Sequence, residues 1–191
     1  MQGPSTLQVI QAHSRQHLLG ILALQQANLL ETIGLREAAE QGFVTVKHTE
    51  DLLQRMNVYA PHTILVGEGE VKGYALSMVR DFRFEIEILM TMFERIDQLN
   101  YHGCRLKEAN YMVMGQVCID KSFRGQGNFI HLYNGMRRFL SSKYDFCITE
   151  VATRNVRSMQ AHLNAGLEIV DLYSEPDKGE WAVFAWDWRN R

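Results

Sequence analysis

Residues 118–140 read CIDKSFRGQGNFIHLYNGMRRFL, and this stretch joins a strand, a turn and a helix with no linker between them. The apolar run at 111–119 predicts a buried strand, and the turn after it carries Gly125 and Gly127. An amphipathic helix over 129–141 follows at once. The first N–H groups of a helix are unpaired and carry a partial positive charge, and glycine lets them approach an anion closely. The stretch therefore predicts a phosphate-binding turn, to which Arg124 adds a cation; a plain strand-to-helix connection is the alternative.

Two familiar phosphate sites do not fit this turn. It has no G-K-[ST] of a P-loop, and no third glycine followed by an acidic residue about 20 positions later, as a dinucleotide site requires. A second strand, DFCITEV at 145–151, follows the helix. The order strand, turn, helix, strand is typical of a crossover between two parallel strands.

The remaining patterns predict a mixed sheet flanked by helices. Strands or extended segments are expected at 6–12 and 43–49, and hairpins at 63–79 and 167–188. Helical patterns cover 15–30 with Ser14 as the cap, then 32–41, 50–57, 80–100 and 158–165. We expect one α/β domain over residues 1–191, in which residues 1–60 form a mainly helical N-terminal portion.

Composition narrows the class of protein. The chain has 191 residues, 46% of them hydrophobic, and a formal net charge of -2, so no basic surface points to a nucleic-acid partner. Its three cysteines form no disulfide or metal-binding pattern, which favours reduced thiols and a cytoplasmic protein. No secretory signal and no apolar run of membrane-spanning length is found, so we expect no membrane partner. The histidines include no H-E-x-x-H motif, and we expect no metal.

With a second motif about 30 residues later, the sequence resembles a known family. The turn matches the CoA-binding motif of the GNAT superfamily of acyl-CoA N-acyltransferases at Ile119, Phe123, Arg124, Gly125 and Gly127. The segment NVRSMQAHLNAGL at 155–167 matches the family's downstream motif at Asn155, Ser158, His162, Gly166 and Leu167. The resemblance is specific over 112–170 and weak over the first 60 residues. It implies a GNAT-like acetyltransferase fold, a central mixed sheet flanked by helices, that uses acetyl-CoA as co-substrate.

The resemblance also implies binding roles. The strands at 111–119 and 145–151 would diverge and leave a slot for the pantetheine arm. Backbone groups of Val117 and Ile119 would pair with that arm, and the Val117 N–H would point at the thioester oxygen. The CoA pyrophosphate would lie on the turn, and CoA would be held from the opposite helix. The implied cofactor-binding residues are Val117, Ile119, Arg124, Gly125, Gln126, Gly127, Asn128, Phe129, Asn155 and Ser158.

The catalytic groups are less clearly marked. His162 stands where the family often has a tyrosine that protonates the departing thiolate, so it is either that acid or a packed histidine. Tyr133, on the helix after the turn, is an alternative donor. Glu150 lies on a strand beside the slot and is either a general base for the amine or a structural carboxylate. Phe129 stands where a small residue is common, and we expect it to pack beneath the turn.

Two other polar groups in the strand at 111–119 were weighed. Gln116 is polar within an apolar run, so it needs a hydrogen-bond partner and is a candidate for the acceptor site. Cys118 invites an acyl-enzyme hypothesis, but its neighbours favour a buried, unreactive thiol.

The sequence thus predicts an N-acetyltransferase that moves an acetyl group from acetyl-CoA to a primary amine. A non-catalytic acyl-CoA-binding sensor is the alternative. The acceptor is a small-molecule amine or a protein amine, and a homodimer is left open. Residues 80–110 are longer than a strand connection requires, so they form either a lid over the acceptor or an ordinary helical segment packed on the sheet.

Overall fold

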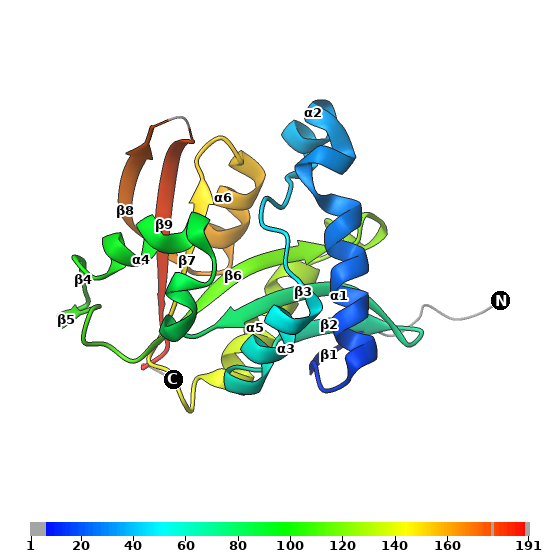
Figure 1. Cartoon of the computed structure of the whole chain (residues 1–191), viewed down its shortest axis with the longest axis horizontal. Helices are drawn as coiled ribbons and strands as arrows, with labels where there is room; N and C mark the ends of the chain where they lie inside the picture. The colour runs from blue at the N-terminus through cyan, green and yellow to red at the C-terminus, as the bar shows by residue number, and fades with distance from the viewer. Residues whose placement is uncertain (1–6, 177, 190–191) are drawn as a thin grey trace.

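A seven-stranded mixed sheet runs through the middle of the molecule (Figure 1). The computed structural model describes residues 7–176 and 178–189. The strand order is β1-β2-β3-β6-β7-β9-β8, in which only β6 and β7 are parallel. The strands are β1 (Gln8–Gln11), β2 (Thr63–Gly67), β3 (Glu70–Met78), β6 (Tyr111–Ile119), β7 (Phe146–Ala152), β8 (Glu168–Glu175) and β9 (Gly179–Asp187); β4 (Asn100–Tyr101) and β5 (Cys104–Arg105) form a separate small ladder.

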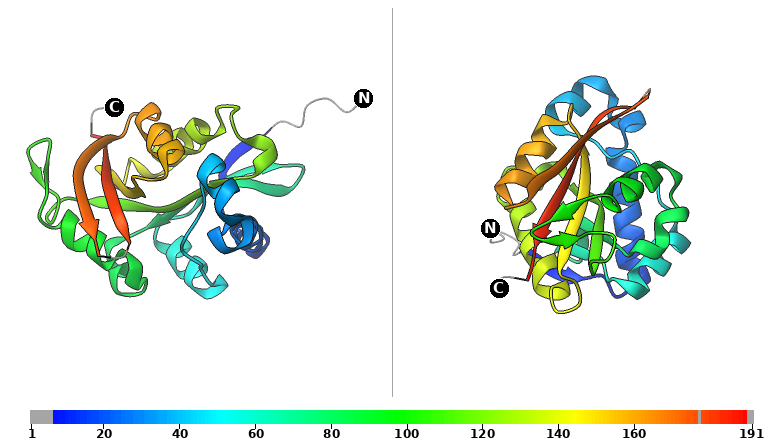
Figure 2. Two further views of the ribbon diagram at one scale, coloured as in Figure 1. Left: turned by 90° about the horizontal axis from the view of Figure 1, so that it is seen from above. Right: turned by 90° about the vertical axis from the view of Figure 1, so that its left-hand side faces the viewer.

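Helices cover both faces of the sheet, as Figure 2 shows from above. One face carries α1 (Arg15–Asn28), α3 (Glu50–Tyr59) and α4 (Met90–Ile96), and the other carries α5 (Asn128–Leu140) and α6 (Val156–Asn164). A further helix, α2 (Leu30–Gln41), is kinked at Gly34. The described residues also include three short 3-10 helices: η1 (Arg80–Phe84), η2 (Glu87–Leu89) and η3 (Lys121–Phe123). No helix within the described ranges has both the length and the apolar character needed to cross a bilayer.

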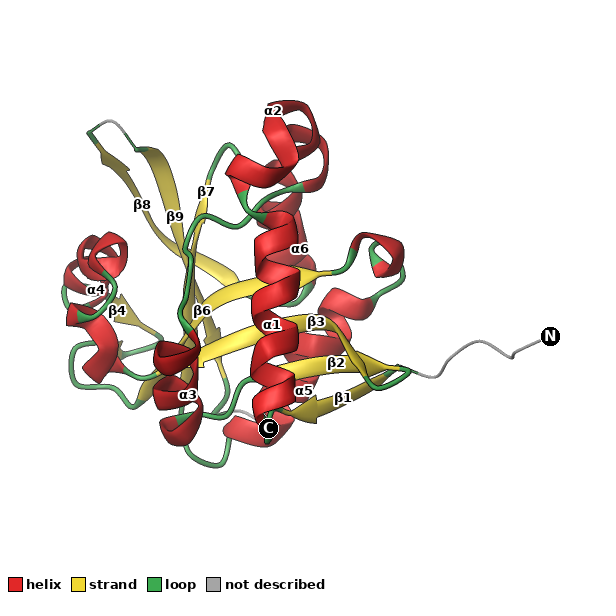
Figure 3. Cartoon of the chain, turned by 45° about the vertical axis from the view of Figure 1, so that its right-hand side comes forward, coloured by secondary structure: helices red, strands yellow, loops and turns green. Residues whose placement is uncertain are grey.

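An extended segment crosses the sheet between α2 and α3 (Figure 3), and we call residues 42–48 the strap. Its only strand-like pairing in the described part of the chain is a parallel bridge between Leu29 and Val44. Gln116 of β6 donates its Nε2 to the Val46 carbonyl at 2.8 Å. Gln25 of α1 accepts from the His48 N–H at 2.9 Å. The strap is therefore tied to both the sheet and α1.

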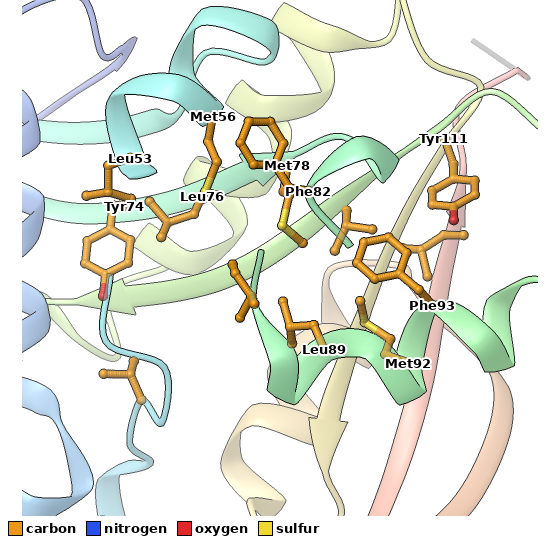
Figure 4. Close-up of a cluster of buried hydrophobic side chains, with 14 of the residues drawn as sticks. Leu53, Met56, Tyr74, Leu76, Met78, Phe82, Leu89, Met92, Phe93 and Tyr111 are labelled. Atoms are coloured by element: carbon orange, nitrogen blue, oxygen red, sulfur yellow. The ribbon is translucent and has the colours of Figure 1, made fainter. Parts of the chain in front are cut away.

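Buried side chains join the α4 side of the sheet to the helices above it. Figure 4 shows residues of α3, β3, η1 and α4 pointing toward one another, among them Leu53, Leu76, Phe82, Met92 and Phe93. Each is at most 4% exposed. Burial of a side chain of this size contributes about 1.5–3 kcal/mol to folding, so this cluster fixes α4 firmly on the sheet.

Most elements lie where the sequence predicted them, including the α/β class and the mixed sheet. The helical pattern at 80–100 differs, because it is split into η1, η2 and α4. Ile86 is extended at φ -128° and ψ 91° and is buried, so the chain turns there to keep its apolar side chain in the core. Residues 43–49 are extended and do not join the sheet, which is the second of the two predicted alternatives.

Candidate functional site

The two parallel strands form a fork. β6 and β7 pair only at Tyr111–Phe146, Met112–Cys147 and Val113–Ile148. Beyond this point the Thr149 hydroxyl donates to the Met114 carbonyl at 2.8 Å, and the strands then diverge. The pairing of β6 with β3 also shifts by one residue here, which leaves Gly115 as a bulge. A slot therefore opens between the strands, in agreement with the predicted divergence.

The free edge of β6 presents backbone groups to this slot. The Asp120 N–H donates to the Lys72 carbonyl of β3 at 2.8 Å. Backbone groups of a strand alternate between its two edges, so those of Cys118 also face β3. Val117 and Ile119 consequently face the slot. The Ile119 carbonyl accepts from Arg124 Nε at 2.8 Å. The backbone N–H and C=O of Val117 and the N–H of Ile119 therefore remain to face the cavity.

The glycine turn and the start of α5 form one wall of a cavity of about 320 Å³, which we call the outer cavity. Gly125 and Gly127 have φ of 74° and 78°, a left-handed conformation that favours glycine. A Cβ at either position would meet no heavy atom within 4 Å. Gly127 is the N-cap of α5 and supplies no side-chain cap, so the first N–H groups of the helix are open to a ligand. The turn fits an anionic group.

Arg124 lies partly inside the protein rather than over the turn. Besides its bond to Ile119, its Nη2 donates to the Asn28 side chain at the end of α1. Its Nη1 is buried with no partner among the described residues, and Arg124 lines the outer cavity. A buried donor of this kind needs an acceptor, which an anionic ligand would provide. The side chain thus ties β6 to α1 and keeps one donor for the cavity.

The opposite wall is the N-terminal part of α6. Asn155 is its N-cap, and its Oδ1 accepts from the Ser158 N–H at 3.2 Å. A Cβ at Gly42 would lie 3.2 Å from the same Oδ1, so the strap meets α6 across the slot. Both Asn155 and Ser158 line the outer cavity, as does Phe43 of the strap.

A second cavity of about 100 Å³ lies within the slot between β6 and β7, and we call it the inner cavity. Glu150 of β7 lines it, and the Tyr173 hydroxyl donates to Glu150 Oε2 at 2.5 Å. Burial raises the pKa of Glu150 to about 7, against the lowering effect of the Tyr173 bond. A carboxyl group that titrates near neutrality can exchange a proton with a bound amine.

His162 and Tyr133 form a buried pair on the α6 side of the inner cavity. The Ser158 carbonyl accepts from His162 Nδ1 at 2.7 Å, so that nitrogen carries the hydrogen. Nε2 then accepts from the Tyr133 hydroxyl at 2.7 Å. Burial lowers the pKa of His162 to about 4, which keeps the ring neutral. Phe129 stacks on Tyr133 with ring centroids 4.7 Å apart, beneath the turn as expected.

The structure brings most of the predicted site residues together. All the predicted cofactor-binding residues except Gln126 line the outer cavity, and Gln126 donates its amide to the Ser122 carbonyl instead. Glu150 and His162 share the inner cavity, and Tyr133 lies behind His162. Their roles in binding and catalysis stay predictions.

The remaining candidates lie at or beside the inner cavity or in the core. Cys118 is 7% exposed and burial raises its pKa to about 11, in keeping with an unreactive thiol. Gln116 lines the inner cavity, where the sequence made it a candidate for the acceptor site, and its Oε1 accepts from Gln25 and from the Tyr74 hydroxyl. Residues 80–96 pack on the sheet, and Leu89 of this segment lines the inner cavity.

Some residues of the site carried no sequence signal. Phe43 and Val46 reach it through the strap, Trp181 and Tyr173 through the last hairpin. Strand pairing places Trp181 and Tyr173 there, and the Gln116 side chain holds the strap in place. His13 and His17 have an H-x-x-x-H spacing, yet no group of three or more metal-binding side chains occurs within residues 7–176 and 178–189.

The chain resembles known proteins in its fold but not in its sequence. No family model matches the sequence, and no curated protein matches it. Solved structures do share its fold. An acetyltransferase of the GNAT family from Streptococcus pneumoniae matches with a TM-score of 0.63 and 12% identity, over 95% of this chain and 99% of that chain. The protein yncA from Salmonella typhimurium, solved with its cofactor acetyl-CoA, matches with a TM-score of 0.64 and 12% identity, over 98% and 96%.

A third structure extends the likeness to an enzyme that modifies a protein. The ribosomal-protein-S18-alanine N-acetyltransferase from Escherichia coli matches with a TM-score of 0.61 and 10% identity, over 95% of this chain and 94% of that chain. All three likenesses span nearly the whole of both chains. They establish the architecture. The chain has the fold of the GNAT superfamily of acyltransferases.

Proposed function

We propose that this protein is an N-acetyltransferase that transfers the acetyl group of acetyl-CoA directly to a primary amine. One observation carries the proposal: the glycine turn, the open N-terminus of α5 and the free edge of β6 all line one cavity of about 320 Å³. The neighbour solved with acetyl-CoA supports it at the level of the fold.

The residues of the outer cavity fit acetyl-CoA. The pyrophosphate would lie against the backbone N–H groups from Gly125 to Phe129, where the positive end of α5 favours an anion. Arg124 Nη1, buried and without a partner in the described part of the chain, would donate to it. The pantetheine arm would pair with the free edge of β6 at Val117 and Ile119, and Asn155 and Ser158 would contact it from α6.

The transfer needs one nucleophile and two proton movements. The amine nitrogen attacks the thioester carbon and forms the C–N bond, while negative charge develops on the carbonyl oxygen. The Val117 N–H would stabilise that charge. Glu150 accepts the proton that the nitrogen loses, and its pKa near 7 suits this role. The C–S bond then breaks, and coenzyme A leaves as a thiolate that takes up a proton.

Direct donation to the thiolate by His162 conflicts with its hydrogen bonds. Its Nδ1 hydrogen is held by the Ser158 carbonyl and its Nε2 accepts from Tyr133. We propose that Tyr133 is the donor of the pair and that His162 orients it. Donation requires the Tyr133 hydroxyl to turn from His162 Nε2 towards the slot, because in this structure it lines neither cavity. The alternative, a sensor that binds acyl-CoA without turnover, would show the same binding but no transfer.

Two broader expectations also stay proposals. The acceptor is a small-molecule amine or a protein amine, and the Escherichia coli neighbour is named for the latter kind. Cys104, Cys118 and Cys147 are free thiols, which supports a reducing, cytoplasmic setting.

The first test measures thermal unfolding with and without acetyl-CoA, followed by release of free thiol with a panel of amines. A ligand that binds the native state raises the unfolding midpoint, and we expect a rise at millimolar acetyl-CoA. Thiol release that depends on the amine supports the transferase. A midpoint rise with no release from any amine or peptide supports the sensor, and no rise refutes both.

A further inference from the structure

The inner cavity limits the size of the acceptor, if the proposed function holds. Its volume is about 100 Å³, and a cavity of about 150 Å³ holds one benzene ring. The strap covers it with Phe43 and Val46, and η2 closes another side with Leu89. A few carbon atoms and an amine fit within this volume.

The polar groups of the inner cavity limit its chemistry. Glu150 is the acidic side chain that lines it, and Glu175 lies close enough to raise the pKa of Glu150 further. A carboxylate on the acceptor would be repelled by this carboxyl group. The acceptor is thus cationic or neutral, and its amine lies toward Glu150.

Trp181 belongs to the same wall. It pairs with Ala152 of β7, while Glu150 pairs with Val183, two residues further along β9. Residues directly opposite each other, and residues two apart on a strand, share a face of the sheet, so Trp181 and Glu150 project from the same face. The indole Nε1 of Trp181 is buried and has no partner among the described residues. A buried donor left unpaired is unfavourable until an acceptor reaches it.

We propose that the acceptor is a small primary amine that carries an uncharged hydrogen-bond-accepting oxygen, and that Trp181 recognises this oxygen. An ether, a hydroxyl or a carboxamide a few bonds from the nitrogen has the required chemistry. The amine lies against Glu150, the oxygen accepts from Trp181 Nε1, and Val46 and Leu89 contact the carbon atoms between them.

The test compares two amines of equal length, 2-methoxyethylamine and butylamine, by the kcat/KM of thiol release. In the first an ether oxygen replaces one CH2 group. Because this oxygen also lowers the pKa of the amine, each value is expressed per neutral amine. We expect wild type to prefer 2-methoxyethylamine and Trp181→Phe to lower this preference about tenfold, as loss of one hydrogen bond requires. Trp181→His retains a ring N–H, and we expect it to restore part of the preference.

Trp188→Phe is the matched control. Trp188 Nε1 is also buried without a partner in the described residues, but its side chain lies in the cluster on the α5 side of the sheet. We expect this variant to keep the wild-type preference. An unchanged preference in Trp181→Phe, or an equal loss in Trp188→Phe, would overturn the inference. So would a peptide N-terminus that is acetylated faster than either amine.

The outcomes separate the inference from the proposed function. If acetyl-CoA binds but no amine is acetylated, the transferase proposal is wrong and the inference falls with it. If amines are acetylated but wild type shows a corrected preference of one or less, only the inference is wrong. This second comparison uses the wild-type protein alone, so it decides the matter even where Trp181→Phe fails to fold.

Discussion

Replacement of Gly125 by glutamate tests the phosphate-binding turn most directly, and the hairpin between β2 and β3 provides its control. Gly125 and Gly69 have φ of 74° and 79°, and a Cβ at either would meet no heavy atom within 4 Å. Any residue with a Cβ pays about 1–2 kcal/mol for this left-handed conformation. Gly125→Glu and Gly69→Glu should therefore lower the free energy of unfolding by similar amounts.

Only Gly125→Glu should weaken acetyl-CoA binding, because it places a carboxylate beside the pyrophosphate. Two like charges about 4 Å apart repel by about 1–4 kcal/mol for effective dielectric constants between 80 and 20. This corresponds to a loss of affinity of about 5- to 1000-fold. The assay is isothermal calorimetry on both variants, with chemical denaturation to confirm that each is folded. A folded Gly125→Glu that binds acetyl-CoA within threefold of Gly69→Glu would refute the assignment of the turn.

Three further results are expected. Glu150→Gln should reduce kcat/KM by about 100-fold and remove the rise of the rate through pH 7 that the ionisation of Glu150 causes, as a pH–rate profile would show. Tyr133→Phe should lower kcat more than His162→Gln does, without weakening acetyl-CoA binding; the reverse order in single-turnover kinetics would make His162 the acid. Finally, burial lowers the pKa values of His48, His62 and His162 to about 4, so stability is lost as pH falls from 6.5 towards 4. Glu150, whose pKa is raised, opposes this loss of stability between pH 7 and 4.5. The three histidines and Glu150 together leave a net difference of two protons between the unfolded and the native state, so the free energy of unfolding changes by up to about 3 kcal/mol per pH unit. Urea unfolding at several pH values would measure this slope.

The sequence predicted the part of the site that is built from consecutive residues. The glycine turn, the start of α5 and the Asn155 cap each depend on local backbone chemistry, so their residue types and spacing mark them. The fork of β6 and β7 followed from the motif resemblance and not from periodicity. Alternation alone left the orientation of Glu150 undecided, and only the register with β9 places it on the face toward the strap.

The parts that the sequence did not predict depend on long-range contacts. The strap is held by Gln116, which lies far along the chain in β6, and its own pattern at 43–49 resembles a strand. Trp181 and Tyr173 belong to an ordinary hairpin pattern, and nothing local distinguishes their cavity-facing sides. The break at Ile86 likewise arises because burial in the core outweighs the helical periodicity of 80–100.

The fork has a mechanical consequence. Three residue pairs, the Thr149 bond to Met114 and the bond from the Asp145 N–H to the Asn110 carbonyl join one half of the sheet, β1-β2-β3-β6, to the other half, β7-β9-β8. The seam between the halves is thus the line along which the sheet yields most easily. A pantetheine arm bound along the free edge of β6 would add contacts between the two halves and hold them together. Amide hydrogens along β6 and β7 should then exchange more slowly when acetyl-CoA is bound, while those of β2 and β8, away from the seam, change little.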